Sequence, residues 1–201
     1  MLRVGFSFYI QCMNYLVCGL GNIGPEYELT RHNIGFLVLD RLADEYKVSF
    51  SLARHAFVGE LRYKGRTITL VKPTTFMNLS GKAVNYWMKE AKVPLENLLI
   101  VMDDIALPFG RMRMRGKGSD GGHNGLKSIR ETLETDAYAR LRFGVGGDFS
   151  KGHQVDYVLG NFPKAELEQL APLMDKACNG ILSFCTIGLE RAMNTVNTAS
   201  Q

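Results

Sequence analysis

Two histidines lie in sequence contexts that suit general-base catalysis. His32 and His123 are each followed by asparagine, and each lies where a glycine-rich turn gives way to a predicted helix; such junctions in α/β proteins are where substrates usually dock. A histidine needs an orienting carboxylate to act as a general base near neutral pH. Asp103 and Asp104 could supply one, because they end an apolar run typical of a strand buried on both faces. Successive strand residues point to opposite faces, so only one of the two can reach a histidine easily.

The chain offers little that would suit a covalent nucleophile. No serine lies in a G-x-S-x-G elbow, and Cys18 falls inside a predicted buried strand. The residues instead favour attack by a water molecule that histidine assists, with the amides of Asn22 and Asn78 available to hold a carbonyl group or the water. Taken singly, each histidine fits a structural role better than a catalytic one.

The net charge of +4 is concentrated in one window of the sequence. Residues 110–142 contain eight lysines and arginines against four acidic residues, a surplus of four that equals the surplus of the whole chain. A localised excess of this kind indicates a site for phosphates or another acidic partner.

Within this window, basic residues occupy every second position from 111 to 117, which is the period of a strand, so they should project from one face. Beside them lie a glycine-rich loop at 116–122 and a helix that Asn124 could cap, where guanidinium and backbone N–H groups can bind phosphate oxygens. An alternative of nearly equal weight is that Met112 and Met114 face the core and the arginines form the solvated side of an edge strand.

Dinucleotide binding is a rival that the wider pattern does not favour. Residues 19–24 and 116–121 both match G-x-G-x-x-G. The first match runs into Pro25 without an immediate helix, and the second lacks an acidic residue near position 141. The P-loop pattern also fails, because Lys117 is followed by Gly118. We therefore expect no cofactor.

The four cysteines indicate a reduced, metal-free protein of the cytoplasm. They form no C-x-x-C pair and have no histidine at metal-ligand spacing. Cys178 and Cys185 share a helical face and are expected in the core. No apolar stretch is long enough to cross a bilayer, so no membrane partner is expected.

The order of the elements predicts an α/β fold. Strands are expected at 15–20, 56–63, 67–72, 97–102, 111–115 and 141–145, with helices beginning near Thr30, Ser80 and Asn124 and filling the last 40 residues. This alternation predicts a single-domain three-layer sandwich, whose mixed, mostly parallel, twisted sheet is flanked by helices. Residues 1–12 are interpreted as an N-terminal extension and residues 13–201 as one domain.

Several longer segments closely resemble bacterial-type peptidyl-tRNA hydrolases. The most specific are P-T-T-F-M-N-L-S-G at 73–81 and G-G-H-N-G-L at 121–126. Others are Gly19-Leu20-Gly21-Asn22, Tyr27 with residues 30–35, Asp103-Asp104 and Arg140-Leu141-Arg142, so that the resemblance extends from residue 15 to about residue 197.

The resemblance implies a monomer that hydrolyses the ester between a peptide and the 3′ end of tRNA, which recycles tRNA from abortive translation. It implies that His32 is the general base on water and that Asp103 stabilises its basic form. Asn22 matches a position that helps to distinguish a blocked amino group from a free one. Further implied positions are substrate contacts at Tyr27, Phe76, Asn78 and Asn124, cleft walls at Met77 and His123, and a clamp on the tRNA 5′ phosphate at Arg115 and Arg142.

The other basic residues of the window are expected to steer tRNA in a general way. Ile23, Met102, Ala106 and Lys117 depart from the usual family pattern, and none of them removes a catalytic group. The alternative from another class is a non-catalytic RNA-binding protein, since the fold has relatives that act as splicing cofactors. Joint retention of His32, Asp103, Asn22 and Asn78 favours the enzyme.

Overall fold

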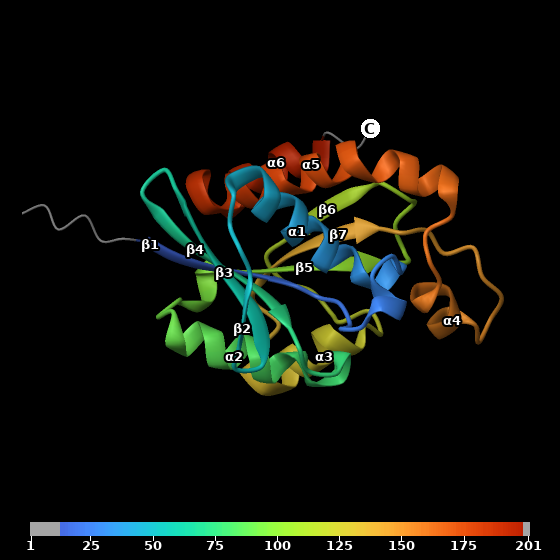
Figure 1. The fold of residues 1–201 in the computed structure, drawn as a ribbon, viewed down its shortest axis with the longest axis horizontal. Coiled ribbons are helices and arrows are strands. Elements are labelled where there is room, and N and C mark those ends of the chain that lie inside the picture. Colours follow the sequence, from blue (N-terminus) through green and yellow to red (C-terminus); the bar gives the residue numbers. More distant parts are fainter. Residues whose placement is uncertain (1–12, 199–201) are drawn as a thin grey trace, which may run out of the picture.

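A twisted seven-stranded sheet runs through the middle of the molecule, with helices on both of its faces (Figure 1). The computed structural model describes residues 13–198. The extension predicted over residues 1–12 therefore lies outside the described residues. Among the helices that are described, none is both long enough and apolar enough to span a membrane.

The strand order is β2-β3-β4-β1-β5-β7-β6. The strands are β1 (Met13–Gly19), β2 (Ser51–Ala53), β3 (Ala56–Tyr63), β4 (Arg66–Pro73), β5 (Leu98–Asp104), β6 (Met112–Arg115) and β7 (Ala139–Gly144). The four central strands β4, β1, β5 and β7 are parallel, and the antiparallel pairings are confined to the two edges. The predicted α/β fold with a mixed sheet is confirmed.

Helices divide between the two faces of the sheet (Figure 1). One face is covered by α1 (Ile34–Tyr46), α5 (Lys164–Ile187) and α6 (Leu189–Thr198), and the other by α2 (Ser80–Glu90) and α3 (Asn124–Leu133). The short α4 (Gln154–Leu159) lies beyond the carboxyl ends of the parallel strands, against the 3₁₀ turn Arg31–Asn33. Three further 3₁₀ turns are Pro25–Tyr27, Met77–Leu79 and Leu95–Asn97.

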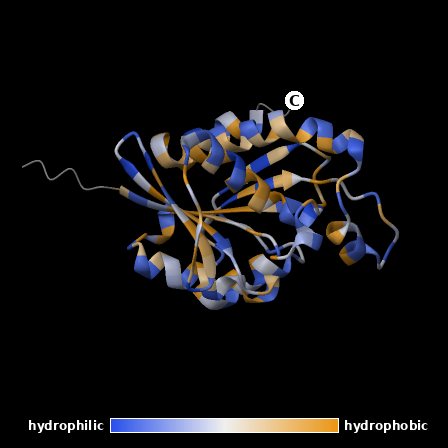
Figure 2. Cartoon of the chain, viewed as in Figure 1, coloured by the Kyte–Doolittle hydropathy of each residue, from blue (hydrophilic) through white to orange (hydrophobic). Residues whose placement is uncertain are grey.

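The period of two along each central strand creates two cores. In β1, Tyr15 and Val17 belong to the core under α1 and α5, whereas Leu16 and Cys18 belong to the core under α2 and α3. Figure 2 shows hydrophobic residues gathered along the central strands and a mixture of polar and hydrophobic residues on the helices. Because both faces are covered, these strands carry near-continuous apolar runs, as parallel strands usually do.

The C-terminal helix also closes one edge of the sheet. Strand β6 is the last strand on its side, and the side-chain amide of Asn197 in α6 pairs with the backbone of Met114. Met114 N–H donates to Oδ1 of Asn197 at 2.8 Å, and Nδ2 of Asn197 donates to the Met114 carbonyl at 3.3 Å. The amide thus takes the place of a neighbouring strand.

Local details differ from the sequence prediction in several places, and the helix expected over the last 40 residues is divided into α5 and α6. The hydroxyl of Thr30 donates to the carbonyl of Tyr27 instead of capping α1, because a 3₁₀ turn intervenes before the helix. Strand β7 begins at Ala139, two residues before the predicted strand. Neither β2 nor α4 was predicted, since both are short and have exposed residues that break any apolar period.

The start of α1 lies directly against the ends of β1 and β5, which is possible because residue 35 is glycine. A Cβ atom at Gly35 would lie 2.4 Å from the nitrogen of Leu20 and 2.6 Å from the carbonyl oxygen of Val101. Both atoms belong to the backbone, so neither can rotate away. This contact places the turn that precedes α1 at the carboxyl end of the sheet.

We expect Gly35→Ala to lower the free energy of unfolding by about 3 kcal/mol, because the methyl group overpacks a rigid backbone contact. Urea unfolding followed by circular dichroism measures the change. Gly65→Ala is the matched control: its Cβ has open space, and only its positive φ of 75° is unfavourable, so it should cost about 1 kcal/mol. Equal losses in the two variants would contradict the packing argument.

Candidate active site

A cleft of about 490 Å³ opens at the carboxyl ends of β5 and β7, bordered by residues 117–124 and by α4. Ligands of open α/β sheets usually bind at this end of the strands. Of the eleven site residues that the resemblance implies, eight line the cleft: Asn22, His32, Met77, Asp103, Arg115, His123, Asn124 and Arg142.

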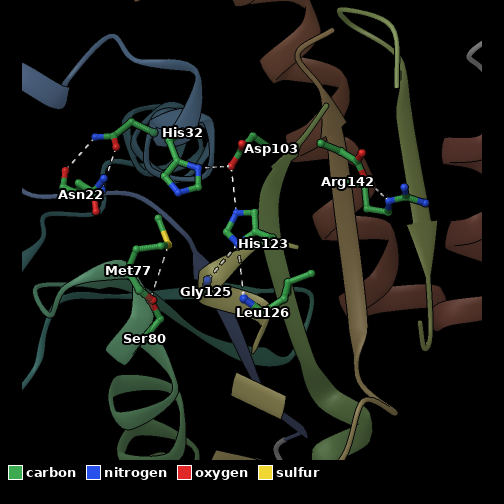
Figure 3. Close-up of polar contacts among 11 residues, drawn as sticks. Asn22, His32, Met77, Ser80, Asp103, His123, Gly125, Leu126 and Arg142 are labelled. Carbon is green, nitrogen blue, oxygen red and sulfur yellow. Dashed lines mark hydrogen bonds and ion pairs between the residues drawn. The ribbon is translucent and has the colours of Figure 1, made fainter. Parts of the chain in front are cut away.

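At the centre of the cleft, His32 is held by Asp103 (Figure 3). Nδ1 of His32 lies 2.8 Å from Oδ1 of Asp103. An ionised carboxylate only accepts hydrogen bonds, so Nδ1 carries the proton and Nε2 keeps its lone pair. Nε2 makes no hydrogen bond to any residue from 13 to 198. His32 therefore has the tautomer that a general base requires.

His123 binds the same carboxylate oxygen from the other side (Figure 3). Its Nε2 lies 3.0 Å from Oδ1 of Asp103, while its Nδ1 accepts the backbone N–H groups of Gly125 and Leu126 at 3.1 and 3.4 Å. These contacts fix the opposite tautomer, with the proton on Nε2. His123 is thus the N-cap of α3, which corrects the prediction that Asn124 caps this helix.

The carboxylate of Asp103 is buried, with 3% of its surface exposed. Burial by itself would raise the pKa of Asp103, but the electrostatic attraction and the hydrogen bonds of the N–H groups of His123 and His32 outweigh it, so the pKa of Asp103 lies below its ordinary value. The group is consequently an anion in the folded chain, and it orients both imidazoles through one oxygen atom.

Asp104 points to the opposite face of β5 and has a different partner. Its Oδ2 accepts Nε of Arg142, and its Oδ1 accepts the backbone N–H of Ala106 at 2.8 Å. The alternation of strand residues therefore separates two carboxylates: Asp103 contacts the histidines, and Asp104 contacts a cation of the neighbouring strand.

Asn33 links the turn that carries His32 to Asn22. Its Oδ1 accepts the N–H of Asn22 at 2.8 Å and its Nδ2 donates to the carbonyl of Asn22 at 2.9 Å, so the turn that carries His32 also fixes the backbone of Asn22 (Figure 3). The side-chain amide of Asn22 makes no hydrogen bond to the described residues. Sequence reasoning assigned no role to Asn33, although it stands directly after His32.

The segment from Phe76 to Asn78 reaches the cleft through its middle residue alone. Met77 is buried in the cleft wall, and its carbonyl accepts the hydroxyl of Ser80 at 2.8 Å. Phe76 is 80% exposed, and neither Phe76 nor Asn78 is among the residues that line the cleft; the same is true of Tyr27. Substrate contacts at these three positions stay predictions.

The strand with alternating arginines has features of both interpretations of its sequence, the phosphate-binding face and the edge strand with a methionine core side. Met112 and Met114 are buried and β6 is an edge strand, while its arginines face the other way. Across the antiparallel pair, Arg113 is in register with Arg142, and Arg115 with Arg140, so four arginines share one face. Of the basic residues at alternate positions from 111 to 117, only Arg115 and Lys117 line the cleft.

Arg140 departs from the prediction that the remaining basic residues form a solvated steering surface. It is only 2% exposed, because its side chain lies under the glycine-rich loop. Its guanidinium group donates to backbone carbonyl groups of that loop instead of facing solvent.

The short helix α4 forms a cleft wall that sequence reasoning missed. Val155, Val158 and Leu159 of α4 line the cleft. Arg31 holds the helix in place: its NH1 donates to the carbonyl of Asn161 at 3.0 Å, and its guanidinium carbon lies 4.3 Å from the centre of the Tyr157 ring. Three apolar residues in a six-residue helix are too weak a signal to reveal this wall beforehand.

His32, Asp103 and His123 are also a potential ligand set, since their donor atoms lie within 4.8 Å of one another. Hydrogen bonds already engage these atoms, however. Nδ1 of His32 and Nε2 of His123 direct protons at Asp103, and Nδ1 of His123 accepts two backbone N–H groups. A cation would have to displace these contacts, including the cap of α3.

The buried cysteines do not offer an alternative nucleophile. Cys178 and Cys185 are in the core as predicted, and burial raises the pKa of each to about 12. Burial also raises the pKa of Cys18. A protonated thiol is a poor nucleophile, so these three residues behave as small apolar side chains.

An α/β sheet that presents a histidine–aspartate pair beside available amide groups and cations defines a class of enzyme, the hydrolases in which histidine activates water. The family model for peptidyl-tRNA hydrolase matches residues 16–201. The chain belongs to the peptidyl-tRNA hydrolase family.

Similarity to individual proteins leads to the same family. The chain is 60% identical to the peptidyl-tRNA hydrolase of Cytophaga hutchinsonii, over 92% of this chain and 99% of that protein. It is 54% identical to the peptidyl-tRNA hydrolase of Bacteroides fragilis over the same shares of the two chains. The crystal structure of peptidyl-tRNA hydrolase from Acinetobacter baumannii superposes with a TM-score of 0.85 at 34% identity, covering 91% of this chain and 94% of that one.

Asp103→Asn should lower the free energy of unfolding at pH 7 by about 2 kcal/mol, because it weakens the acceptor of two buried N–H groups. The pKa of Asp103 is lowered in the folded chain from its ordinary value of 3.8, so its ionised form stabilises the fold above about pH 4. That contribution is lost as the pH falls toward the lowered value. The difference between variant and wild type should therefore shrink below pH 4.

Urea unfolding at pH 7, 5 and 3 measures this dependence. Asp156→Asn is the control, since Asp156 is an exposed carboxylate paired only with the exposed His153 among the described residues. A stability difference for Asp103→Asn that is the same at all three pH values would contradict the linkage.

Proposed function

We propose that the chain hydrolyses the ester between a peptide and the 3′ end of tRNA, with His32 as the general base that activates water. Family membership supports the reaction. The observation that carries the role of His32 is its hydrogen bond to Asp103. In the neutral imidazole this bond places the proton on Nδ1 and leaves the lone pair on Nε2, in a residue that lines the cleft.

In the proposed reaction, Nε2 of His32 takes a proton from water as the water oxygen attacks the ester carbonyl carbon. The charge of Asp103 stabilises the imidazolium that forms, and burial keeps this charge from being screened by solvent. When the tetrahedral intermediate collapses, the ester bond to the ribose breaks, and His32 returns the proton to the leaving ribose oxygen. The products are the free peptide acid and a tRNA with an unblocked 3′ end.

The side-chain amides of Asn22 and Asn124 are the proposed contacts for the substrate around the ester. Both line the cleft, and an amide N–H can stabilise the oxyanion or hold the peptide carbonyl group. The tie between Asn33 and Asn22 supports a positioning role, because it sets the location of Asn22 relative to His32. Met77 and His123 supply walls of the same cleft. Asn78, Phe76 and Tyr27 are proposed to meet more distant parts of the substrate.

Arg115 and Arg142 are the proposed clamp for the tRNA 5′ phosphate. Both line the cleft on the face shared by β6 and β7. Arg115 is exposed and forms no ion pair with residues 13–198, whereas Arg142 keeps its position through Asp104. A guanidinium group fixed by a carboxylate through Nε still presents its remaining N–H groups to a second anion.

We further propose that the chain acts as a monomer in the cytoplasm, that residues 13–201 form its one domain, and that catalysis uses neither metal nor cofactor. The hydrogen bonds that occupy His32, Asp103 and His123 support the last point. No observation on the described residues favours the alternative of a non-catalytic RNA-binding protein.

His32→Ala should lower kcat for N-acetylated aminoacyl-tRNA by at least about a hundredfold, the usual contribution of a general base. Release of the acetylated amino acid at saturating substrate measures the effect. His153→Ala is the control, because His153 is exposed and contacts only Asp156 among the described residues. Near-normal turnover by His32→Ala, with its fold intact, would refute the assignment.

Arg115→Ala combined with Arg142→Ala should lower the affinity for tRNA substrates far more than the affinity for short esters that lack a 5′ phosphate. Each lost phosphate contact should reduce the slope of the logarithm of binding affinity against the logarithm of salt concentration by about 1. Titrations at several salt concentrations measure this slope. Arg115→Ala alone keeps the ion pair between Arg142 and Asp104, so its comparison with the double variant shows the effect of losing that pair. Equal losses on both kinds of substrate would speak against the clamp.

A further inference from the structure

Arg140 is a buried cation without a carboxylate partner. NH1 donates to the carbonyls of Gly118 and Ser119 at 2.8 and 3.1 Å, and NH2 donates to the carbonyl of Asp136 at 2.8 Å. The guanidinium carbon lies 4.5 Å from the centre of the Tyr138 ring. The buried Nε has no hydrogen-bond partner, and no acidic side chain of the described residues forms an ion pair with Arg140.

This arrangement is unfavourable for stability alone. A charge removed from water needs close compensation, and burial lowers the pKa of Arg140. Arg140 also lies directly across the β6–β7 pair from Arg115, and like charges at such positions repel. An apolar side chain would fill the same place without either cost. The interactions that only an arginine provides at this position are its hydrogen bonds to backbone carbonyls, two of which belong to the loop and one to Asp136.

Arg140 determines which way the glycine-rich loop presents its backbone. A trans peptide directs its C=O and N–H groups to opposite sides. Because the carbonyls of Gly118 and Ser119 point at Arg140, the N–H groups of Ser119 and Asp120, which share their peptide planes, point away from it. The N–H of Ser119 donates to no described residue, and neither do those of Gly118 and Gly121 beside it. The loop therefore turns the unpaired N–H of Ser119 away from Arg140, and unpaired backbone donors in a loop of this kind can bind an anion.

Asp120 fixes the other end of the loop. Its Oδ1 accepts the N–H of Gly122 at 3.0 Å, its Oδ2 accepts NH1 of Arg130, and its carbonyl accepts the N–H of His123 at 2.9 Å. The loop is therefore held at residues 118 and 119 by Arg140 and at residue 120 by the contacts of Asp120. Its donors lie in the same cleft border as Arg115 and Lys117.

From this geometry we infer that Arg140 is a positioning residue for phosphate recognition: it holds the loop so that backbone N–H groups of residues 118–121 bind the same tRNA phosphate as Arg115. The inference rests on the proposed function, which supplies the tRNA. Arg140 itself does not touch the phosphate. It acts through the loop, and a phosphate bound there would meet backbone donors in addition to the guanidinium group.

The test compares N-acetylated aminoacyl-tRNA carrying a 5′ phosphate with the same substrate after removal of that phosphate. The measured quantity is the ratio of the two kcat/KM values. In Arg140→Met, which keeps an unbranched apolar stem but loses every donor, this ratio should fall about tenfold relative to wild type, mainly through KM; tenfold corresponds to one good polar contact. Arg62→Met is the control for loss of one positive charge, because Arg62 is exposed and pairs only with Glu60 among the described residues.

Arg140→Lys provides a second variant in case Arg140→Met does not fold. A single ammonium keeps the charge but cannot span the carbonyls of Gly118, Ser119 and Asp136, so the ratio should still fall. A ratio that stays at the wild-type value in the folded variants, including equal losses on both substrates, would overturn the positioning role. A wild-type chain that hydrolyses both substrates equally well would overturn the phosphate clamp and this inference together, and a wild-type chain inactive on both would overturn the proposed function itself.

Discussion

The site depends on one oxygen atom, Oδ1 of Asp103, which accepts a hydrogen bond from each of two imidazoles. Because the carboxylate is buried and ionised, it fixes opposite tautomers in His32 and His123. One histidine is left with a lone pair facing the cleft, and the other uses its lone pair to cap α3. A single buried charge therefore links the proposed base to the helix that forms the opposite wall.

The alternation of side chains along β5 and β7 determines on which face of the sheet each of the remaining polar groups lies. Asp103 faces the histidines, while Asp104 on the other face holds Arg142. The same alternation places Arg140 and Arg142 on one side of β7 and leaves the opposite side to the core. The proposed esterase centre and the proposed phosphate clamp are consequently neighbours: both use residues of β5, but these residues point to opposite faces of the sheet.

Much of the fold and the site follows from local patterns. The apolar run before Asp103 and the rule of alternation were enough to predict that only one of the two carboxylates would reach a histidine. The N-cap of α3 was assigned to Asn124 because asparagine is a common cap, whereas the tautomer that lets His123 serve depends on Asp103, 20 residues away. Arg140 was misjudged because alternation gives its face, which it shares with Arg142, but does not reveal that the glycine-rich loop covers its side chain.

Strand β6 carries Arg115 of the proposed phosphate clamp and lies at the outer edge of the sheet, where unpaired backbone groups can pair with strands of other molecules. The amide of Asn197 occupies those groups at Met114. At this residue α6 therefore blocks the backbone pairing that leads to edge-to-edge aggregation. Because Asn197 contacts the backbone edge of the strand, Arg115 stays exposed for the proposed contact with tRNA.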